Sequence, residues 1–260
     1  MSGWVAVDCA PSGPCSWQMT GGDAGAPQTW PAGTSPAEVA AAFPGRTVVA
    51  CGAAAAPLSK LPSTPSETAP VAVQDGLYLV PGLRQAEPAL EMRGGETRIA
   101  GFLSLNSNWD GVICLPGPRS HWALVSAREV VSFQSFLSGE MIAALCATPS
   151  LSGIGGAWDA ETFHDALSES LSRPERMASR LASLGPEDAA RLVGLVLGGE
   201  MAAARPYWLG QQVAVIGAGD AARPYVAALE AQGVPVTQTD ETRMVLAGLT
   251  AAWRRIGEEK

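Results

Sequence analysis

The clearest chemical pattern in the chain lies near its C-terminal end. Residues 215–222 read Val-Ile-Gly-Ala-Gly-Asp-Ala-Ala, which fits an apolar strand followed by G-x-G-x-x-A and a helix. Asp240 follows at about the spacing of an acid that binds the ribose of a dinucleotide. Gly217 and Gly219 would let the backbone approach a phosphate at a helix N-terminus. The pattern is open to three interpretations: tight structural packing, a contact to an adenine nucleotide, and NAD binding.

The remaining length argues against NAD among these alternatives. A dinucleotide-binding half needs the order strand, helix, strand, helix, strand. Only 20 residues follow Asp240, enough for one helix. A third strand therefore cannot follow.

Histidine and cysteine chemistry is poorly supported by the sequence. The two histidines, His121 and His164, are far apart, which argues against a metal site or a catalytic triad built on histidine. The five cysteines include no C-x-x-C pair, and four lie in or beside apolar runs. Buried reduced thiols are the expected state.

The elements that must position any site change in character along the chain. In the first part we expect strands and loops, with Ser35 as the N-cap of a short helix that starts at Pro36. These expected elements are a β-hairpin of Trp4–Asp8 and Cys15–Met19, strands at Arg46–Cys51, Leu77–Val80 and Val112–Leu115, a second hairpin of His121–Val125 and Val130–Phe133, and a long proline-rich surface loop over 54–70.

From Gly139 onward, apolar residues recur at three- and four-residue spacing, which predicts helices. The expected elements are helices at Glu140–Ala147, Ala160–Leu171, Pro174–Leu184 and Pro186–Ala204, then strand Gln212–Ile216, helix Asp220–Ala231, strand Val234–Val236 and helix Glu241–Ile256. The simplest division is an N-terminal strand and loop lobe, 1–137, and a C-terminal helix-rich lobe, 138–260.

Composition excludes several classes of protein. With 47% hydrophobic and 16% charged residues, the 260-residue chain is globular. The 17 basic residues are scattered, include only two lysines and are outnumbered by 25 acidic ones, so we expect no nucleic-acid partner. No apolar run is long enough to span a membrane, and no signal peptide is visible. We expect a cytoplasmic protein without a membrane partner, and leave a homodimer open.

Several short motifs occur in a compatible order over nearly the whole chain. They are Ala6-Val7-Asp8 with Trp17, Pro81-Gly82-Leu83, the MRGGET stretch Met92–Thr97, Leu115-Pro116-Gly117 with Trp122, Phe133–Glu140, Leu197–Glu200, and Ile216-Gly217 with Tyr225. Together they resemble the 2-dehydro-3-deoxygalactonokinase family. The resemblance implies an α/β, two-lobed, actin-like ATPase fold of ribonuclease H-like type with a cleft between lobes. It also implies phosphorylation of 2-dehydro-3-deoxy-galactonate by ATP with Mg²⁺.

The resemblance also implies roles for individual residues. Asp8 would hold the metal through water, or else form a turn, and the following turn would bind phosphate through Ser12 and Gly13. Arg93 and Glu96 would bind the substrate carboxylate and take its hydroxyl proton, or else form a structural ion pair. Thr97 and Glu140 would also contact substrate, although Glu140 could simply cap a helix. The nucleotide set is completed by Gly117, Arg119, Gly217 and Gly219.

The phosphate loops depart from the family pattern. Ala10 and Pro11 stand where the family has a glycine and a threonine, Pro118 and Arg119 replace a Thr-His pair, and residues 52–56 lose polar groups. Proline supplies no N–H donor. We therefore expect a kcat below the kinase range of roughly 1 to 100 s⁻¹. The open alternatives are a non-catalytic binder of a sugar acid or nucleotide on the same scaffold, and an NAD-binding oxidoreductase fragment.

Overall fold

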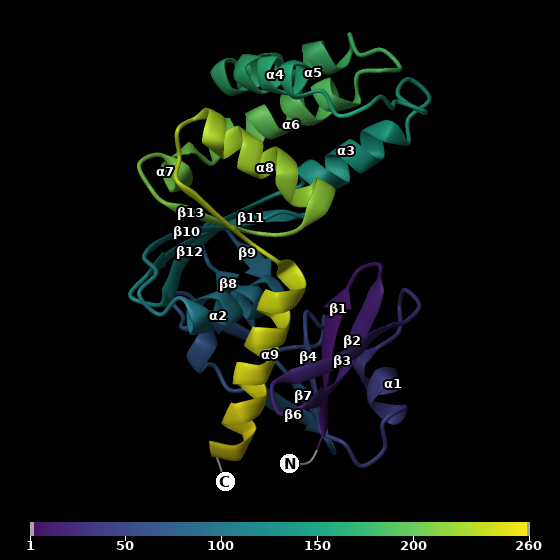
Figure 1. Ribbon diagram of the computed structural model, residues 1–260, viewed down its shortest axis with the longest axis vertical. Helices are drawn as coiled ribbons and strands as arrows, with labels where there is room; N and C mark the ends of the chain where they lie inside the picture. Colours follow the sequence, from purple (N-terminus) through teal and green to yellow (C-terminus); the bar gives the residue numbers. More distant parts are fainter. Residues whose placement is uncertain (1–2, 259–260) are drawn as a thin grey trace. The chain divides into compact units, whose positions relative to one another are not determined.

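The computed structural model describes residues 3–258 and has a mixed α/β fold (Figure 1). Its strands are β1 Trp4–Ala10, β2 Gly13–Thr20, β3 Asp23–Thr29, β4 Val48–Cys51, β5 Leu58–Lys60, β6 Val71–Gln74, β7 Leu77–Leu79, β8 Gly82–Gln85, β9 Leu90–Met92, β10 Gly111–Leu115, β11 Ser120–Ser126, β12 Glu129–Phe136, β13 Val213–Ile216 and β14 Val236–Thr239. Its α-helices are α1 Pro36–Ala41, α2 Gly95–Leu105, α3 Ser138–Cys146, α4 Ala160–Ser172, α5 Met177–Leu181, α6 Ala189–Ala203, α7 Arg205–Trp208, α8 Gly219–Ala231 and α9 Glu241–Glu258, with 3₁₀ turns η1 Pro65–Glu67 and η2 Pro174–Arg176.

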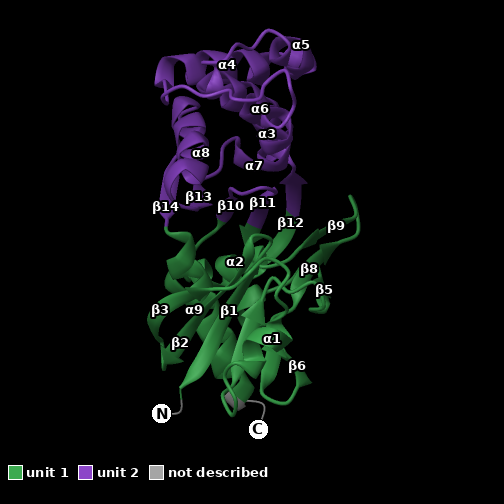
Figure 2. Ribbon diagram, turned by 90° about the vertical axis from the view of Figure 1, so that its right-hand side faces the viewer, with its two compact units in different colours: residues 1–110, 125–132, 240–260 green, residues 111–124, 133–239 purple. Residues whose placement is uncertain are grey.

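The chain folds into two compact units, coloured separately in Figure 2. Unit 1 contains residues 1–110, 125–132 and 240–260, and unit 2 contains 111–124 and 133–239. This division differs from the single boundary expected at residues 137 and 138. The chain enters unit 2 at β10, returns to unit 1 for residues 125–132 and returns there again for α9. Strand and helix pairing, rather than sequence order, therefore determines each unit.

Unit 1 is built on a six-stranded sheet with the order β3-β2-β1-β4-β7-β6. The expected hairpin at the start of the chain is confirmed, since β1 pairs antiparallel with β2. β1, β4 and β7 run parallel, and β2 pairs antiparallel with β3, as β6 does with β7. The parallel centre puts the ends of β1, β4 and β7 at one edge of the sheet, where polar residues can meet.

The two faces of this sheet are covered by different helices. Because side chains alternate along a strand, Trp4 and Ala6 pack with Leu249 of α9, whereas Val5 and Val7 pack with Val39 of α1. α1 begins as expected from the sequence: Ser35 and Glu38 form a reciprocal capping box. Both apolar clusters therefore contain residues that are far apart in the chain.

Helix α2 crosses α9 at two glycines in unit 1. A Cβ on Gly248 would clash with the carbonyl oxygen of Thr97, and a Cβ on Gly101 would clash with that of Met244. Only glycine permits this approach of the two backbones. The contact fixes the position of α2, whose first turn carries Glu96 and Arg98.

The expected long surface loop over 54–70 is wrong in part. β5 pairs in parallel with β8, β8 pairs antiparallel with β9, and a bridge joins Ser63 to Val130. Pro65 and Ser66 in η1 are buried. Three-residue strands lie below the length at which hydrophobic alternation identifies a strand.

Unit 2 contains a sheet with the order β12-β11-β10-β13-β14, in which β10, β13 and β14 run parallel. Its apolar core joins Val213 and Val215 of β13 to Phe163 and Leu167 of α4 and to Leu197 of α6. The expected helices α3, α4, α6 and α8 are present within a few residues of their predicted limits.

Some expectations for unit 2 need correction. The helix expected at Pro174–Leu184 is a 3₁₀ turn, η2, followed by the five-residue α5, and Pro186 lies before α6 rather than in it. The strand expected at Val234–Val236 is shifted to β14. Within residues 3–258, no helix combines the length and the apolar character needed to cross a membrane.

Candidate functional site

The polar cluster of unit 1 lies where β4 ends beside β1. Asp8 of β1 is the register partner of Cys51, the last residue of β4. Asp8 is 9% exposed, and the Cys51 thiol donates to its Oδ1 at 3.4 Å. Burial, followed by the nearby Asp8 carboxylate, raises the pKa of Cys51 well above its usual range. This thiol therefore stays protonated, and it serves as a donor to Asp8.

Arg98 of α2 connects Asp8 to the start of α9. Its Nη2 lies 2.7 Å from Oδ2 of Asp8 and 2.6 Å from Oε1 of Glu241, and its Nε donates to the same Glu241 oxygen at 2.7 Å. Nη1 donates to the carbonyl oxygen of Gly94 at 3.0 Å. Burial alone would lower the pKa of Arg98, but Asp8 and Glu241 raise it above its ordinary value. The guanidinium is thus a permanent positive charge bound to two carboxylates.

Glu96 lies in the first turn of α2 and is 1% exposed. Its Oε1 accepts from the backbone N–H of Gly94 at 2.9 Å and from the hydroxyl of Thr97 at 3.1 Å. Its Oε2 is buried and has no hydrogen-bond partner among the described residues. A buried polar atom without a partner is uncommon and suggests a missing ligand, water or proton.

The environment of Glu96 also changes its acidity. Burial raises its pKa from 4.5 to about 7, although hydrogen bonds from Gly94 and Thr97 and the charge of Arg98 act in the opposite direction. A carboxyl group with a pKa near 7 exchanges protons near neutral pH, as general bases do. Glu96 can therefore act as an acid or a base.

Two glycines permit α2 to begin close to the end of β4. Gly52 and Gly94 have φ values of 74° and 87°, in the left-handed region that favours glycine. A Cβ on Gly94 would lie 3.4 Å from the Cα of Gly52. These turns bring the first turn of α2 against the residues that follow β4.

Arg93 and Thr97 are held by the protein itself. Nη1 of Arg93 donates to the carbonyl oxygens of Ala53 and Ala56, at 3.3 and 2.7 Å, and Nη2 contacts the carboxylate of Glu91 at 3.2 Å. Thr97 is 1% exposed, and its hydroxyl is donated to Glu96. Arg93 thus positions residues 53–56, and Thr97 orients Glu96.

The turn that was expected to bind phosphate joins β1 to β2. Ser12 and Pro11 are exposed there. Gly13 has a φ of 121°, and a Cβ at this position would clash with the carbonyl oxygen of Trp30, so packing alone requires glycine. The hydroxyl of Ser12 is the free polar group that this turn offers.

In unit 2, the loop before β11 packs on the start of α3. The backbone N–H of Glu140 donates to the carbonyl oxygen of Pro118 at 2.9 Å, and a Cβ on Gly139 would clash with the carbonyl oxygen of Gly117. The side chains of Arg119 and Glu140 are exposed. The structure thus brings Gly117, Arg119 and Glu140 together within unit 2.

Gly217 follows β13, and Gly219 is the first residue of α8. Gly217 is buried, and its N–H donates to the carbonyl oxygen of Thr239 at 3.0 Å, whereas Gly219 is exposed with a φ of 56°. β14 is the edge strand of the sheet, and the chain then enters α9 of unit 1. Within the described residues, no third strand extends this segment into a dinucleotide-binding half.

A buried carboxylate of unit 2 ends the motif Leu197–Glu200, but no role was predicted for it from the sequence. Glu200 of α6 accepts at Oε1 from Ser120 at 2.7 Å and Trp122 at 2.8 Å, and at Oε2 from Tyr225 at 3.1 Å. Burial, followed by the charge of Glu200, raises the pKa of Tyr225 well above its usual range. The signal available was an acidic residue within an apolar helical segment, which requires buried partners.

The residues around Asp8 do not fit a Mg²⁺ ion that is coordinated directly by the protein. No group of three or more His, Cys, Asp or Glu side chains in the described part of the chain is arranged to hold a metal. Both Asp8 oxygens already accept from Cys51 and Arg98. An ion at the usual distance of about 2.1 Å from Asp8 would lie roughly 4 Å from the guanidinium. The repulsion would be about 2 kcal/mol in water and about 8 kcal/mol at an effective dielectric constant of 20.

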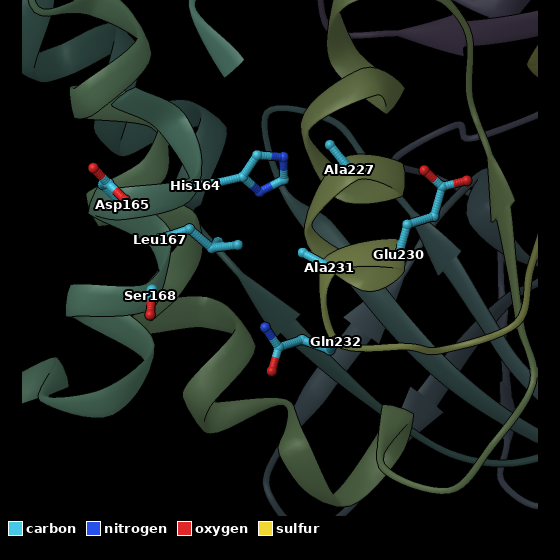
Figure 3. Close-up of a pocket in the computed structure, with 8 residues that line it drawn as sticks. All are labelled: His164, Asp165, Leu167, Ser168, Ala227, Glu230, Ala231 and Gln232. Atoms are coloured by element: carbon cyan, nitrogen blue, oxygen red, sulfur yellow. The ribbon is translucent and has the colours of Figure 1, made fainter. Parts of the chain in front are cut away.

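A cavity of about 500 Å³ lies between α4 and α8 in unit 2 (Figure 3). Its lining includes His164, Asp165, Glu230 and Gln232, and Nδ1 of His164 is buried without a hydrogen-bond partner among the described residues. None of the site residues expected from the sequence lines this cavity. The polar cluster of unit 1 therefore remains the stronger candidate site.

Comparison with solved structures first defines the class of fold. The chain is similar to the activator of the 2-hydroxyisocaproyl-CoA dehydratase from Clostridium difficile with bound ADPNP, at 11% identity and a TM-score of 0.54. The match covers 99% of this chain and 97% of that one. The expected α/β, actin-like ATPase fold is thereby confirmed.

Sequence comparison then defines the family. The model of the 2-keto-3-deoxy-galactonokinase family matches residues 28–252, and the chain belongs to this family. It is 29% identical to the provisionally named 2-dehydro-3-deoxygalactonokinase DgoK1 of Rhizobium meliloti (strain 1021), over 71% of this chain and 66% of that protein, just under two thirds of its length. It is 25% identical to a candidate 2-dehydro-3-deoxygalactonokinase from Sinorhizobium meliloti, with a TM-score of 0.82 and coverage of 97% and 96%.

Proposed function

We propose that the chain transfers a phosphate group from ATP to a hydroxyl of a 2-dehydro-3-deoxy sugar acid of the galactonate type, in the cytoplasm. Family membership supports this substrate class. The observation that carries the proposal is Glu96, a buried carboxyl group with an unpaired Oε2 and a pKa raised to about 7. Such a group is suited to accept a hydroxyl proton.

In this proposal Glu96 acts as the general base. A sugar hydroxyl gives its proton to Oε2 as its oxygen forms a bond to the γ-phosphorus of ATP. The bond between that phosphorus and the β,γ-bridging oxygen breaks, and ADP leaves with the bonding electrons. The hydrogen bonds from Gly94 and Thr97 to Oε1 keep Oε2 as the oxygen that remains available.

Arg93 is the proposed partner of the substrate carboxylate. Its Nη1 is fixed by two backbone carbonyls, but its Nη2 is paired with Glu91, which is about half exposed. Exposed ion pairs contribute little free energy, so a substrate carboxylate can replace Glu91. In this proposal Thr97 orients Glu96. Glu140, which is exposed in unit 2, stays a predicted substrate residue.

The nucleotide is assigned to backbone and small side chains. The proposed groups are Ser12 and Gly13 in unit 1, and Gly117, Arg119, Gly217 and Gly219 in unit 2. Mg²⁺ would arrive on the phosphate oxygens of ATP, because Asp8 does not fit a metal ligand here. Oligomeric state stays a prediction, with a homodimer still open.

The test is ADP release by the purified chain with 2-dehydro-3-deoxy-galactonate, coupled to a spectroscopic readout. Substrate-dependent ADP release is expected, and Glu96→Gln should lower kcat by about 10²- to 10⁴-fold because it removes the proton acceptor. Glu129→Gln is the matched control, since Glu129 is an exposed glutamate of the same unit. Equal activity of both variants would remove Glu96 from the reaction.

A non-catalytic binder of a sugar acid or nucleotide is the second candidate. Three observations favour it: Arg98 occupies the Asp8 carboxylate, Pro11 offers no N–H donor, and neither does Pro118. Ligand binding raises the melting temperature of a protein without any turnover. A thermal shift with the sugar acid or ATP, together with no ADP release above the Glu96→Gln background, would support this candidate.

A further inference from the structure

The strongest unexplained feature of unit 1 is the arrangement of two acids around one nitrogen. Oδ2 of Asp8 and Oε1 of Glu241 both contact Nη2 of Arg98, at 2.7 and 2.6 Å. Two carboxylate oxygens on one small positive centre is an arrangement that proteins also use to hold a divalent cation. Here the positive centre is the guanidinium group of Arg98, a side chain of the protein itself.

The remaining contacts of Arg98 keep its side chain in this place. Nε donates to Glu241 and Nη1 donates to the carbonyl oxygen of Gly94, so all three nitrogens are used. The side chain is only 14% exposed. A buried pair stays charged when its geometry and hydrogen bonds are satisfied, as they are here.

The charges that surround the guanidinium explain why it stays between the two carboxylates. Asp8 and Glu241 contribute two negative charges, and Arg98 is the one described cation within contact distance of them. Glu96 is close enough for its acidity to respond to Arg98, so a third acid lies in the same field. Without the guanidinium, these acids would repel one another and attract an external cation.

We propose that Arg98 is the resident cation of this site: it takes the position between Asp8 and Glu241 that a divalent ion would occupy, and closes Asp8 to Mg²⁺. Asp8 then serves to position Arg98 and, through it, the first turn of α2. Any dependence of nucleotide binding on Mg²⁺ does not arise at Asp8. The inference concerns ion binding and holds whether or not the chain transfers phosphate.

The test is the binding of Mn²⁺ alone to the whole chain, followed by electron paramagnetic resonance. Asp8→Asn should leave the Mn²⁺ affinity of the protein unchanged. Arg98→Gln should raise that affinity at least tenfold, because it exposes two carboxylates to one vacant position. The double variant Arg98→Gln with Asp8→Asn should lose the gain.

Two control variants separate charge from general disturbance. Arg98→Lys keeps a positive charge, so it should not create a Mn²⁺ site. Arg84→Gln removes the arginine of an exposed pair with Glu91 in the same unit and should also create none. Circular dichroism identifies the variants that remain folded.

A loss of Mn²⁺ binding in Asp8→Asn would show that Asp8 holds the ion in the unmodified chain. A folded Arg98→Gln variant without a gain in affinity would show that the two acids do not form a cation site. If Arg98→Gln does not fold, the Asp8→Asn measurement alone decides.

Discussion

Two buried glutamates, one in each unit, are treated differently by the residues around them. Glu200 in unit 2 accepts three side-chain hydrogen bonds, shared between both of its oxygens. Glu96 in unit 1 is equally buried, but its Oε2 has no partner in the part of the chain that the structure describes. The fully satisfied carboxylate joins α6, β11 and α8 into one structure. The unsatisfied one keeps an acceptor available for a ligand or a proton.

This difference distinguishes buried acids that stabilise the fold from buried acids that are available for a reaction. A satisfied group contributes to stability, and its loss leaves donors buried without partners. An unsatisfied group costs stability when charged and is retained for another reason, most often function. Substitution of Glu200 should therefore lower the free energy of unfolding, whereas substitution of Glu96 should raise it.

The largest effect on stability is expected for Glu200→Ala. It leaves the hydroxyls of Ser120 and Tyr225 and the indole N–H of Trp122 without their acceptor. At about 1 to 3 kcal/mol for each of the three unpaired buried donors, the loss is roughly 3 to 9 kcal/mol. Scanning calorimetry should show a melting temperature at least ~6 °C lower.

Glu200→Gln is the matched control because its side-chain oxygen can still accept one or two of the three hydrogen bonds. It should lose less stability than Glu200→Ala. If both variants have the melting temperature of the unmodified chain, the three hydrogen bonds do not stabilise unit 2.

The second prediction concerns the dependence of stability on pH at Glu96. Its pKa is 4.5 when unperturbed and about 7 in the folded chain, so the folded state binds more protons between these pH values. The stability that this group contributes is present below pH 4.5 and is lost as the pH rises to 7, by about 3 kcal/mol. Glu96→Gln cannot lose a proton and should be increasingly more stable than the unmodified chain across this window.

Melting curves from pH 4.5 to 8 check this prediction, with Glu129→Gln as the exposed counterpart in unit 1. A constant difference between Glu96→Gln and the unmodified chain at every pH would mean that Glu96 ionises normally in the folded state.

A smaller effect is expected where α2, the helix that carries Glu96, contacts α9. Gly248→Ala places a methyl group against the carbonyl oxygen of Thr97, and such overpacking typically costs about 1 to 3 kcal/mol. The displaced helix should also lower kcat, while the hydrogen bonds of Glu200 in unit 2 stay intact.

Gly22→Ala is the control for this substitution, because the nearest atom to its Cβ would be 3.8 Å away. Unfolding midpoints in urea and ADP release should separate the two variants. Identical values for both would show that α2 and α9 can move apart freely.

The smallest effect is expected at Pro118, in the loop that precedes Ser120. Pro118→Thr restores a hydroxyl and an N–H, and its carbonyl oxygen can still accept from Glu140. We expect kcat for ADP release to rise about tenfold, less than the roughly 10²-fold effect of one preorganised donor. An unchanged kcat would show that Arg119 or another group already supplies the phosphate contact.

The sequence predicts the elements whose patterns are local. The first hairpin, the capped helix at Ser35 and the long apolar helices of unit 2 all have strong short-range signals. Helix α2 was missed because Gly94, Gly95 and Gly101 weaken the helical pattern. Gly94 and Gly101 lie against Gly52 and Met244, residues far away in the chain, and one local segment cannot reveal such contacts.

The candidate site was predictable only in its residue types. Asp8, Arg93 and Glu96 were identified from short motifs, but Arg98 was not, although it pairs with Asp8 across 90 positions. Its partner Glu241 is 143 positions away. Ion pairs of this kind depend on the tertiary fold, so a single sequence gives no signal for them.

Trp4 and Trp253 stack at 5.2 Å between ring centroids, and this contact has a consequence for how the chain is made. β1 is synthesised before unit 2, whereas α9, which completes its apolar face, is synthesised after the whole of unit 2. One face of the unit 1 sheet therefore stays uncovered until α9 has been made, and unit 1 should complete its fold after unit 2 during translation.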